Sequence, residues 1–416
     1  MANERSRDLD IVVYGATGFV GRLVAGYLAE ADPGARIGLA GRSESKLAAV
    51  RDSLGPAAAE WPLIIADAAD PEALGRLAGT TSVVASTVGP YAKYGLPLVE
   101  ACAAHGTHYA DLTGEALFVR ECVDRFDAPA RASGARIVNS CGFDSVPSDI
   151  GVYETYRFAA DHDLGHLTDT LLVVTGMRGG FSGGTVDSLR NQIDVIADDP
   201  QSRRIVADPF GLSPNRELDP PRGKDSPHND SIRPTRNAAT GAWLGPFVMA
   251  PFNTRIVRRS NALLDYAYGK DFRYREAVGF GRSPLGPVLA GGMAAGLAGL
   301  VAGMSFAPSR AVLDRLLPDP GEGPGEDARR NGYFRIEIYA RTDSGAMLRT
   351  KVSAHGDPGY AATSVMLGES ALSLAFDGEA LPDRAGVLTP ATAMDGALAD
   401  RLRLAGFTCH PERYRG

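Results

Sequence analysis

Short apolar runs alternate with amphipathic stretches through the first 140 residues. Between the runs, apolar side chains recur at helical spacing, as in 19–31, and Gly106 ends a helix that begins at Gly95. The apolar runs predict buried strands at 10–14, 36–40, 62–67, 82–89 and 135–140. Strands and helices that alternate in this way form βαβ units. The chain therefore begins with an α/β fold, a Rossmann-type doubly wound parallel sheet over residues 1–150.

The pattern changes after about residue 150. Residues 167–177 and 333–341 predict longer strands, and the turn TDSG joins the second of them to 347–355 in a hairpin. Strands that pair locally form antiparallel sheets. Residues 151–357 are therefore predicted to form a second α+β domain on a mostly antiparallel sheet.

Two segments of this second domain stand out. Residues 200–240 are rich in proline and charge, which is typical of a mobile loop or lid. Residues 283–309 carry no formal charge and lie between Arg282 and Arg310. They are long enough to span a bilayer, but they are mostly Ala and Gly and sit inside one folded unit. A buried helix, a helix that dips into a membrane surface and the lining of an apolar channel all remain open.

Charge and cysteine content exclude several classes of protein. The 416 residues include 43 Lys and Arg against 50 Asp and Glu, a net charge of −7 without a basic block, so nucleic acid is not expected as a partner. The four cysteines have no CxxC spacing, and the charged N-terminus is unlike a signal peptide. These features favour the cytoplasm.

The string GATGFVG at 15–21 follows a predicted strand and opens a helix, as a dinucleotide-binding turn requires. Gly15 permits the tight turn, Gly18 lets a pyrophosphate approach the backbone, and Gly21 lets helix and strand pack closely. The second strand ends in Arg42 and Ser43, without the acid that would bind the ribose of NAD. This favours NADP(H), because Arg42 and Ser43 can bind a 2′-phosphate.

Asp67 ends the third predicted strand. We expect it either to flank the adenine or to cap the helix that begins near Pro71.

The fourth strand runs into a turn that carries phenols and an ammonium group. Hydride transfer that leaves negative charge on an oxygen needs such donors, so Tyr91, Lys93 and Tyr94 are the candidate catalytic residues. Tyr94 and Lys93 are adjacent rather than at the Tyr-xxx-Lys spacing of short-chain dehydrogenases, which disfavours that class.

Two later strand ends place polar side chains at the same edge. Asp111 lies in the strand-end segment 108–115, and Asp144 and Ser145 lie in the strand-end segment 141–149; Ser145 is also a candidate helix cap. His105 and His108 are separated by the helix-breaking Gly106, so no metal site is expected.

The glycine-rich segment 177–189 follows a strand in the second domain. It is either an anion-binding helix start at Thr185 or a plain turn.

The motifs GATGFVG, GRS, VGPYAKYG, HYADLTGE and GFDSVPSD occur here in the order typical of the saccharopine dehydrogenase-like family. SGGT at 182–185 and GVLTPATAM at 386–394 extend the likeness over nearly the whole chain. Within that family the chain most resembles the trans-acting enoyl reductases of mycobacteria. The resemblance implies that part of the C-terminal segment, 358–416, folds back onto the nucleotide domain. It also implies cofactor contacts from Gly15, Thr17, Gly18, Phe19, Val20, Arg42, Ser43, Thr87, Val88 and Gly89.

Three hypotheses follow. The first is an NADPH-dependent enoyl reductase that reduces a double bond of a carrier-bound acyl chain, with an acyl carrier or polyketide synthase as partner in polyketide-type lipid biosynthesis. The second is a related oxidoreductase for an amino acid or imine, which would need cations such as Arg178 and Arg190 in the cleft. The third is a non-catalytic NADP-binding protein at a membrane surface, reached through 283–309. The sequence leaves open the acyl chain, the formation of a homo-oligomer, and a location at the inner face of the plasma membrane.

Overall fold

The computed structural model describes most of the chain. The described residues are 7–31, 34–179, 199–221, 223, 226–230, 233–237, 240–304 and 325–414. The glycine-rich segment around Thr185, Arg190 and Arg310 lie outside these ranges.

The first sheet has seven strands in the order β13-β6-β5-β4-β1-β2-β3, and its pairs are parallel. Its strands are β1 (Leu9–Tyr14), β2 (Ile37–Gly41), β3 (Leu63–Ile65), β4 (Thr81–Ser86), β5 (His108–Asp111), β6 (Arg136–Val138) and β13 (Gly386–Leu388). The first six strands have the doubly wound order, which confirms the predicted Rossmann-type sheet. The seventh strand comes from the C-terminal segment and pairs with β6.

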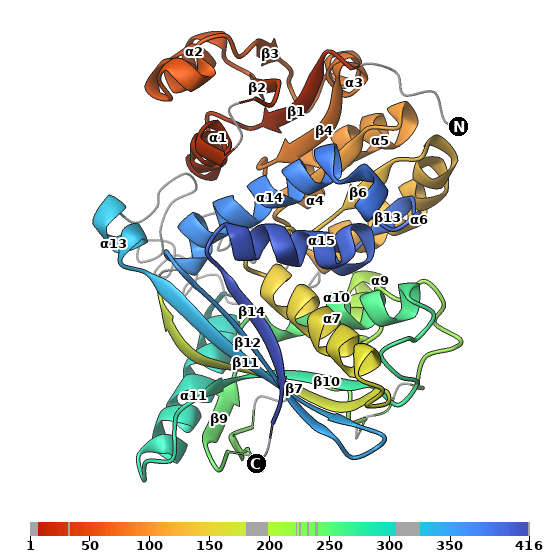
Figure 1. Ribbon diagram of the computed structural model, residues 1–416, viewed down its shortest axis with the longest axis vertical. Helices are drawn as coiled ribbons and strands as arrows, with labels where there is room; N and C mark the ends of the chain where they lie inside the picture. The colour runs from red at the N-terminus through yellow and green to blue at the C-terminus, as the bar shows by residue number, and fades with distance from the viewer. Residues whose placement is uncertain are drawn as a thin grey trace.

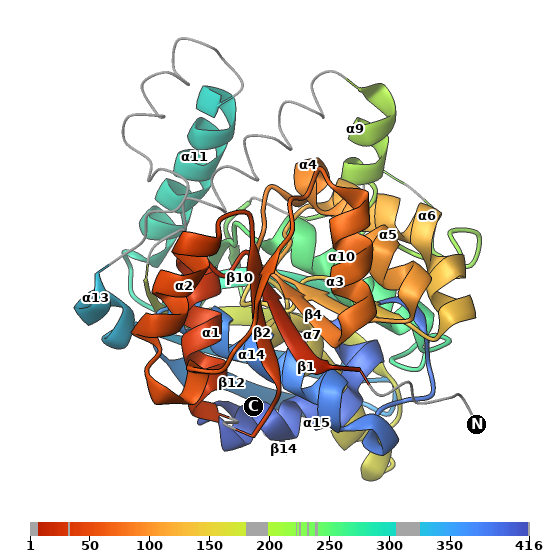
Figure 2. The same cartoon turned by 90° about the horizontal axis from the view of Figure 1, so that it is seen from above.

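Helices cover both faces of this sheet, because successive strand side chains point to opposite sides. Ile11 and Val13 of β1 enter one core, and Val12 and Tyr14 enter the other. The helices that follow these strands are α1 (Phe19–Ala31), α2 (Glu44–Ser53), α3 (Pro71–Thr80), α4 (Tyr91–Tyr94), α5 (Leu96–His105) and α6 (Ala116–Ser133). Figure 2 shows α1 and α2 on one side of the sheet, with α5 and α6 on the other.

The second sheet has the order β14-β12-β11-β7-β10-β9-β8. Its strands are β7 (Leu167–Arg178), β8 (Thr235–Arg236), β9 (Trp243–Pro246), β10 (Arg273–Gly279), β11 (Tyr333–Thr342), β12 (Met347–His355) and β14 (Thr408–Arg413). β7 and β10 pair in parallel, and the remaining described pairs are antiparallel. The predicted hairpin and the mostly antiparallel character are confirmed.

Among the helices in the layer between the two sheets (Figure 1) are α7 (Val146–Asp161), α14 (Thr363–Phe376) and α15 (Pro390–Leu404). One hydrophobic core runs through this layer and includes residues of both sheets. The approach is close, since a Cβ on Gly151 of α7 would lie 2.5 Å from Ile338 Cδ1 of β11.

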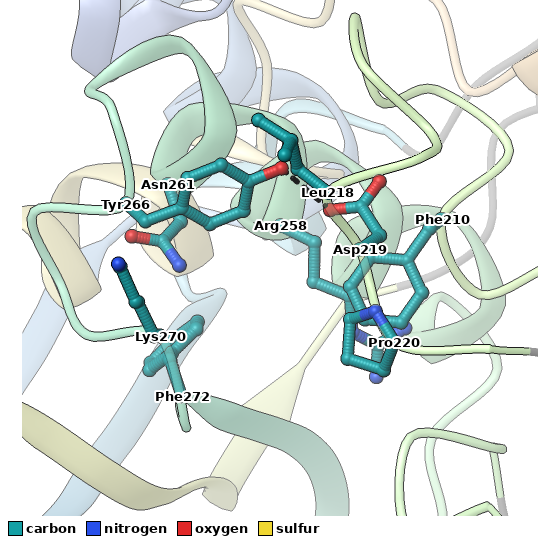
Figure 3. A pocket seen from close by; sticks show the side chains of 9 residues that line it. All are labelled: Phe210, Leu218, Asp219, Pro220, Arg258, Asn261, Tyr266, Lys270 and Phe272. Carbon is teal, nitrogen blue, oxygen red and sulfur yellow. Dashed lines mark hydrogen bonds between the residues drawn. The ribbon is translucent and has the colours of Figure 1, made fainter.

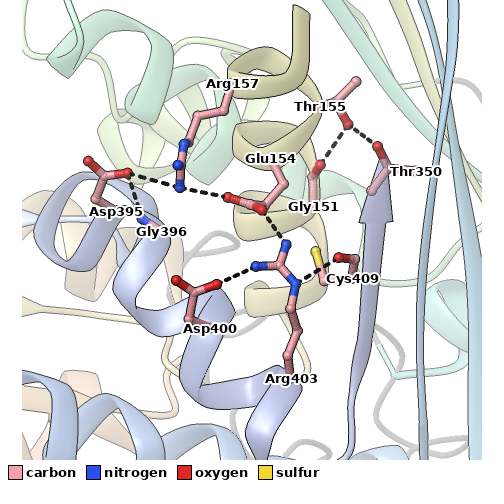
Figure 4. Close-up of polar contacts among 10 residues, drawn as sticks. All are labelled: Gly151, Glu154, Thr155, Arg157, Thr350, Asp395, Gly396, Asp400, Arg403 and Cys409. Carbon is pink, nitrogen blue, oxygen red and sulfur yellow. Dashed lines mark hydrogen bonds and ion pairs between the residues drawn. The ribbon is translucent and has the colours of Figure 1, made fainter. Parts of the chain in front are cut away.

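Ion pairs join α7 to α15 on the flank of this layer (Figure 4). Arg403 pairs with Glu154 and with Asp400, the latter at 2.6 Å, and donates to the carbonyl of Cys409 at 2.9 Å. Arg157 of α7 also reaches Asp395 of α15, at 3.9 Å. The C-terminal part of the chain contributes β13 to the first sheet, α15 to the helices between the sheets and β14 to the second sheet.

The described part of 200–240 contains regular structure and buried side chains. Its helix α9 (Pro200–Ala207) is followed by buried Phe210 and Leu212. Arginines of α10 (Ala250–Leu263) hold this segment through its carbonyls: Arg258 donates to Pro209 O at 3.1 Å, and Arg259 donates to Leu212 O at 2.7 Å. Arg259 also donates to Val387 O of β13 at 2.6 Å, which ties the segment to the first sheet.

The apolar run 283–309 includes α11 (Gly286–Met304), and β11 is preceded by α13 (Glu326–Arg330). Shorter helical turns occur at Pro56–Ala58, Pro358–Ala362 and Gly378–Ala380.

Candidate active site

The turn between β1 and α1 has the close packing that its glycines predict. Gly15 has φ +85°, and a Cβ there would lie 2.6 Å from Val88 Cγ2. A Cβ on Gly21 would lie 2.2 Å from Gly15 O, so helix and turn can approach this closely only without a side chain. Gly18 is exposed on the outside of the turn, where a ligand can reach the backbone.

Several backbone N–H groups at the start of α1 are not used in hydrogen bonds within the described part of the chain. Its first helical hydrogen bond runs from Arg22 N to Gly18 O at 3.0 Å. The N–H groups of Phe19, Val20 and Gly21 have no acceptor among the described residues. Free amides at a helix N-terminus bind phosphate, so this turn fits the pyrophosphate of a dinucleotide.

Two of the residues predicted to select the cofactor lie at the end of β2. Arg42 is exposed and makes no hydrogen bond or ion pair with a described residue. Ser43 caps α2, with its hydroxyl accepting from Lys46 N at 3.5 Å. Arg42 thus presents an exposed guanidinium beside the phosphate turn.

Asp67 is exposed and accepts a hydrogen bond from Ala69 N at 2.9 Å. The cap of the following helix is Asp70, whose carboxylate accepts from Glu72 N and Ala73 N. The capping alternative for Asp67 is therefore wrong. Burial first, and then the charge of Asp67, raise the pKa of Tyr14 to about 12, while Arg42 lowers it.

The residues after β4 pack directly on the phosphate turn. Thr87 N donates to Tyr14 O at 2.9 Å, and the Thr87 hydroxyl is 3.2 Å from the carbonyls of Tyr14 and Gly15. Val88 lies against the open side of Gly15. These contacts fix the 87–89 segment beside the predicted pyrophosphate.

Tyr91 is buried in the nucleotide domain. Its hydroxyl donates to Ser86 O at 3.1 Å and accepts from Leu112 N at 3.2 Å. Burial, followed by the charge of Asp111, raises the pKa of Tyr91 well above its usual value. Its phenol therefore supports the loop rather than facing the crevice.

Glu115 is the second support of this loop, and the sequence did not single it out. Its carboxylate is buried and accepts from the backbone N–H groups of Tyr91 and Ala92, each at 2.9 Å. The Glu115 carboxylate caps α4 and so holds in place the loop that carries Lys93 and Tyr94. Lys93 is exposed with its Nζ 5.1 Å from the centre of the Tyr94 ring, and Tyr94 is partly exposed.

Asp111 and Asp144 follow the neighbouring strands β5 and β6 and differ in their surroundings. Asp111 is buried and accepts from Thr113 N at 3.0 Å, Ser140 N at 2.8 Å and Asn139 Nδ2 at 2.8 Å. Asp144 is partly exposed, and a Cβ on Gly114 would lie 3.5 Å from its Oδ2. It makes no hydrogen bond or ion pair with a residue that the structure describes. Burial raises the pKa of each carboxyl to about 6.

Met249, which precedes α10, covers Gly114 from the side of the second sheet. The same Cβ on Gly114 would lie 3.8 Å from Met249 Cε, so Met249 and Asp144 flank one point on the backbone. Asp144 therefore lies where the carboxyl edge of the first sheet meets the second domain. Ligands of doubly wound folds bind at this edge.

Ser145 does not cap α7 through its side chain, which corrects that expectation. Its hydroxyl instead donates to Asn253 Oδ1 at 3.3 Å, and Asn253 Nδ2 donates to Glu276 Oε2 at 3.0 Å. The physical reason is burial: the hydroxyl lies inside the protein beside an amide of α10, and that amide takes its hydrogen bond.

A cavity of about 210 Å³ lies elsewhere, between the 210–220 segment and the end of α10 (Figure 3). Figure 3 shows the Tyr266 hydroxyl on Asp219, a hydrogen bond of 3.0 Å. None of the predicted cofactor or catalytic residues lines it; the lining residues are Phe210, Leu218, Asp219, Pro220, Arg258, Asn261, Tyr266, Lys270 and Phe272.

Similar proteins cover the whole chain. A Mycobacterium tuberculosis protein provisionally named a trans-acting enoyl reductase is 50% identical over 412 residues, which is 98% of each chain. The Mycobacterium ulcerans protein named trans-acting enoyl reductase is 47% identical over 416 residues, again 98% of each chain. This chain belongs to the trans-acting enoyl reductase family.

Two further comparisons agree with the fold described above. Residues 11–138 match the saccharopine dehydrogenase NADP binding domain. The solved apo saccharopine dehydrogenase (L-Glu forming) from Saccharomyces cerevisiae has the same fold, with a TM-score of 0.53, 13% identity and coverage of 98% of this chain and 100% of the other. Both parts of the predicted resemblance are confirmed, and the NADP-binding domain supports NADP(H) as the cofactor.

Proposed function

We propose that this member of the trans-acting enoyl reductases is an NADPH-dependent oxidoreductase that reduces a carbon–carbon double bond of a carrier-bound acyl chain. The observation that carries the proposal is identity of about 50% over nearly the full length to relatives of that name. The backbone amides at the start of α1 and the exposed Arg42 fit a phosphorylated dinucleotide and support it.

The cofactor would be held by the turn 15–21, by Arg42 and Ser43, and by the segment 87–89. NADPH bound there would supply the hydride for the β-carbon of the unsaturated thioester. The packing of Thr87 and Val88 on the turn keeps the two cofactor-binding segments in one fixed arrangement. Asp67 would flank the adenine.

The proton for the α-carbon has a candidate donor in Asp144. When hydride reaches the β-carbon, the electron pair of the double bond moves toward the thioester oxygen, and the α-carbon then takes a proton. Asp144 lies at the correct edge of the sheet and has no hydrogen-bond partner among the described residues. Its pKa of about 6 leaves a usable protonated fraction near neutral pH, and water restores the proton after each turnover.

Lys93 and Tyr94 are the proposed donors to the oxygen that gains negative charge, since both are exposed on the capped loop. Tyr91 and Glu115 position that loop. The substrate would be presented by an acyl carrier or a polyketide synthase in the cytoplasm, during polyketide-type lipid assembly.

The test uses pure protein, NADPH and an enoyl chain on an acyl carrier protein. We expect loss of NADPH absorbance and gain of two hydrogens in the acyl product, with deuterium from labelled NADPH at the β-carbon. The same chain on coenzyme A and the use of NADH serve as controls. NADPH binding without reduction of any carrier-linked enoyl chain contradicts the proposal, and NADPH oxidation with an imine instead supports the amino-acid alternative.

A further inference from the structure

The 19-residue helix α11 has no ionisable side chain. At about 1.5 Å per residue it is roughly 28 Å long, close to the hydrocarbon thickness of a bilayer. It is the one helix among the described residues that is long and apolar enough to cross a membrane. In both Figure 1 and Figure 2 it stands at the margin of the molecule.

One face of α11 rests on β9. A Cβ on Gly286 would lie 2.7 Å from Trp243 Cδ1, and a Cβ on Gly245 would lie 3.3 Å from Ala290 Cα. Ala290 is fully buried by this contact. Met304, at the C-terminal end of the helix, is 3% exposed, so α11 is covered on one side near both of its ends.

The other faces are open and apolar. Leu285, Val288 and Leu289 are 64%, 67% and 54% exposed. A Cβ on any of four glycines of the helix would meet no atom within 4 Å: Gly291, Gly292, Gly296 and Gly299. At 100° per residue, the open positions from Gly291 round to Met293 cover roughly 200° of the circumference.

The width of this arc decides what can cover it. A packed protein partner needs an apolar stripe of about 100°, whereas a helix that is apolar nearly all round is typical of a protein core or a membrane span. The exposure of Val288 and Leu289 excludes the core of this chain. A helix lying flat in a membrane surface would also carry a polar face, which α11 lacks. The arc therefore favours lipid over a second protein chain.

The base of α11 has the residues that suit a lipid headgroup layer. Trp243 lies against Gly286. Arg236 and Arg282 approach each other at Gly241, where a Cβ would lie 3.7 Å from Arg236 Nη2 and 3.8 Å from Arg282 Nε. Both guanidiniums are exposed, and neither has a carboxylate partner among the described residues. Tryptophan and arginine are the side chains that concentrate at anionic membrane interfaces.

We propose that α11 inserts into an anionic phospholipid bilayer, with Trp243, Arg236 and Arg282 at the level of the headgroups. This docks the protein on the membrane independently of its redox chemistry.

The first experiment is vesicle flotation with phosphatidylcholine alone and with added phosphatidylglycerol. We expect the wild type to float with the mixed vesicles. The double variant Val288→Glu with Leu289→Glu should reduce the floating fraction at least about tenfold, because charged side chains strongly oppose burial in hydrocarbon. The matched control is Leu404→Glu, since Leu404 is 90% exposed on α15 and should leave flotation unchanged. Both proteins should bind NADPH like the wild type, which shows that they are folded.

The second experiment uses fluorescence. The chain has two tryptophans, so Trp61→Phe leaves Trp243 as the sole reporter. Its emission should shift to the blue when mixed vesicles are added. Replacing both Arg236 and Arg282 by Gln should remove the preference for phosphatidylglycerol.

Three results would overturn the proposal. One is a wild type that floats with neither vesicle. Another is flotation that the double glutamate variant retains or that Leu404→Glu also loses. The third is self-association that disappears in the double variant while vesicles remain unbound, which would assign the open arc to a second copy of the chain.

Discussion

The ends of β5 and β6 place two carboxylates at one edge of the sheet and give them opposite environments. Asp111 is enclosed and accepts three hydrogen bonds from the 113 and 139–140 segments, whereas Asp144 has no partner among the described residues and stays partly exposed. Burial raises the pKa of both to about 6. A raised pKa alone therefore does not distinguish an acid that is held by hydrogen bonds from one that has no partner among the described residues.

The largest expected effect is the loss of stability when Asp111 is replaced. Asp111→Ala leaves two backbone N–H groups and the Asn139 amide buried without their acceptor, so the free energy of unfolding should fall by about 3–5 kcal/mol. Urea unfolding measures the change. Glu100→Ala is the control, because Glu100 is 63% exposed in its ion pair with Arg125 and should cost less than about 0.5 kcal/mol. Equal losses in the two variants would contradict the structural role of Asp111.

Asp144 should affect catalysis without loss of fold. Asp144→Asn keeps the shape and removes the transferable proton, so kcat should fall about 100- to 1000-fold while the KM for NADPH stays close to the wild-type value. In the wild type, kcat should decline as the pH rises through about 6, because the acid must be protonated, and the variant should lose that decline. An unchanged pH profile in the variant would show that another group supplies the proton.

A substitution at Arg42 should affect cofactor binding separately from the effect of Asp144 on kcat. Arg42→Gln removes the exposed guanidinium next to the phosphate turn, so the KM for NADPH should rise about 10- to 50-fold while that for NADH changes little. Lys46→Gln removes an exposed cation from the same strand-to-helix region and should leave both KM values unchanged. A similar loss for NADPH and NADH would mean that Arg42 does not read the 2′-phosphate.

The smallest expected effect is the change in the free energy of unfolding with pH that the Asp144 carboxyl causes. The folded carboxyl has a pKa of about 6 against about 3.9 in an unfolded chain, so the native state holds its proton more tightly. Stability is therefore lost as the pH rises from about 4 to 6 and stays lower above it. Since the side chain is partly exposed, Asp144→Asn should be more stable than wild type by at most about 2 kcal/mol at pH 8 and should match it at pH 4. Urea unfolding at the two pH values tests this, and a variant less stable at pH 8 would indicate an unrecognised partner of Asp144.

Several parts of the site were predictable because their signal is local. Gly15 and Gly21 stand where a β-strand must turn into a helix without side chains, and Arg42 follows the next strand in the sequence. The alternation of apolar runs with amphipathic stretches predicted the parallel sheet, again from a local pattern. Tyr91 was also placed in the correct loop, but its burial was not predictable, because the Ser86 carbonyl and Leu112 amide that bind its hydroxyl belong to two different strand ends.

The burial of the arginines of α10 was also not predictable, because their partners lie far away in the sequence. Arg255, Arg258 and Arg259 stand close together in the stretch RIVRR, and all three are buried. The partner of Arg259 at Val387 is 128 residues away. No local pattern carries that information.

By itself, the sequence determined the glycine-rich turn, the parallel sheet, the NADP-binding domain and the family, because each depends on residues that are neighbours in the chain or recur with a regular period. The tertiary structure decided which of two similar acids keeps an accessible carboxyl, which phenol is enclosed, and that α11 lies open rather than in the core. Those outcomes depend on contacts between segments far apart in the chain, where burial and hydrogen-bond partners are set by packing.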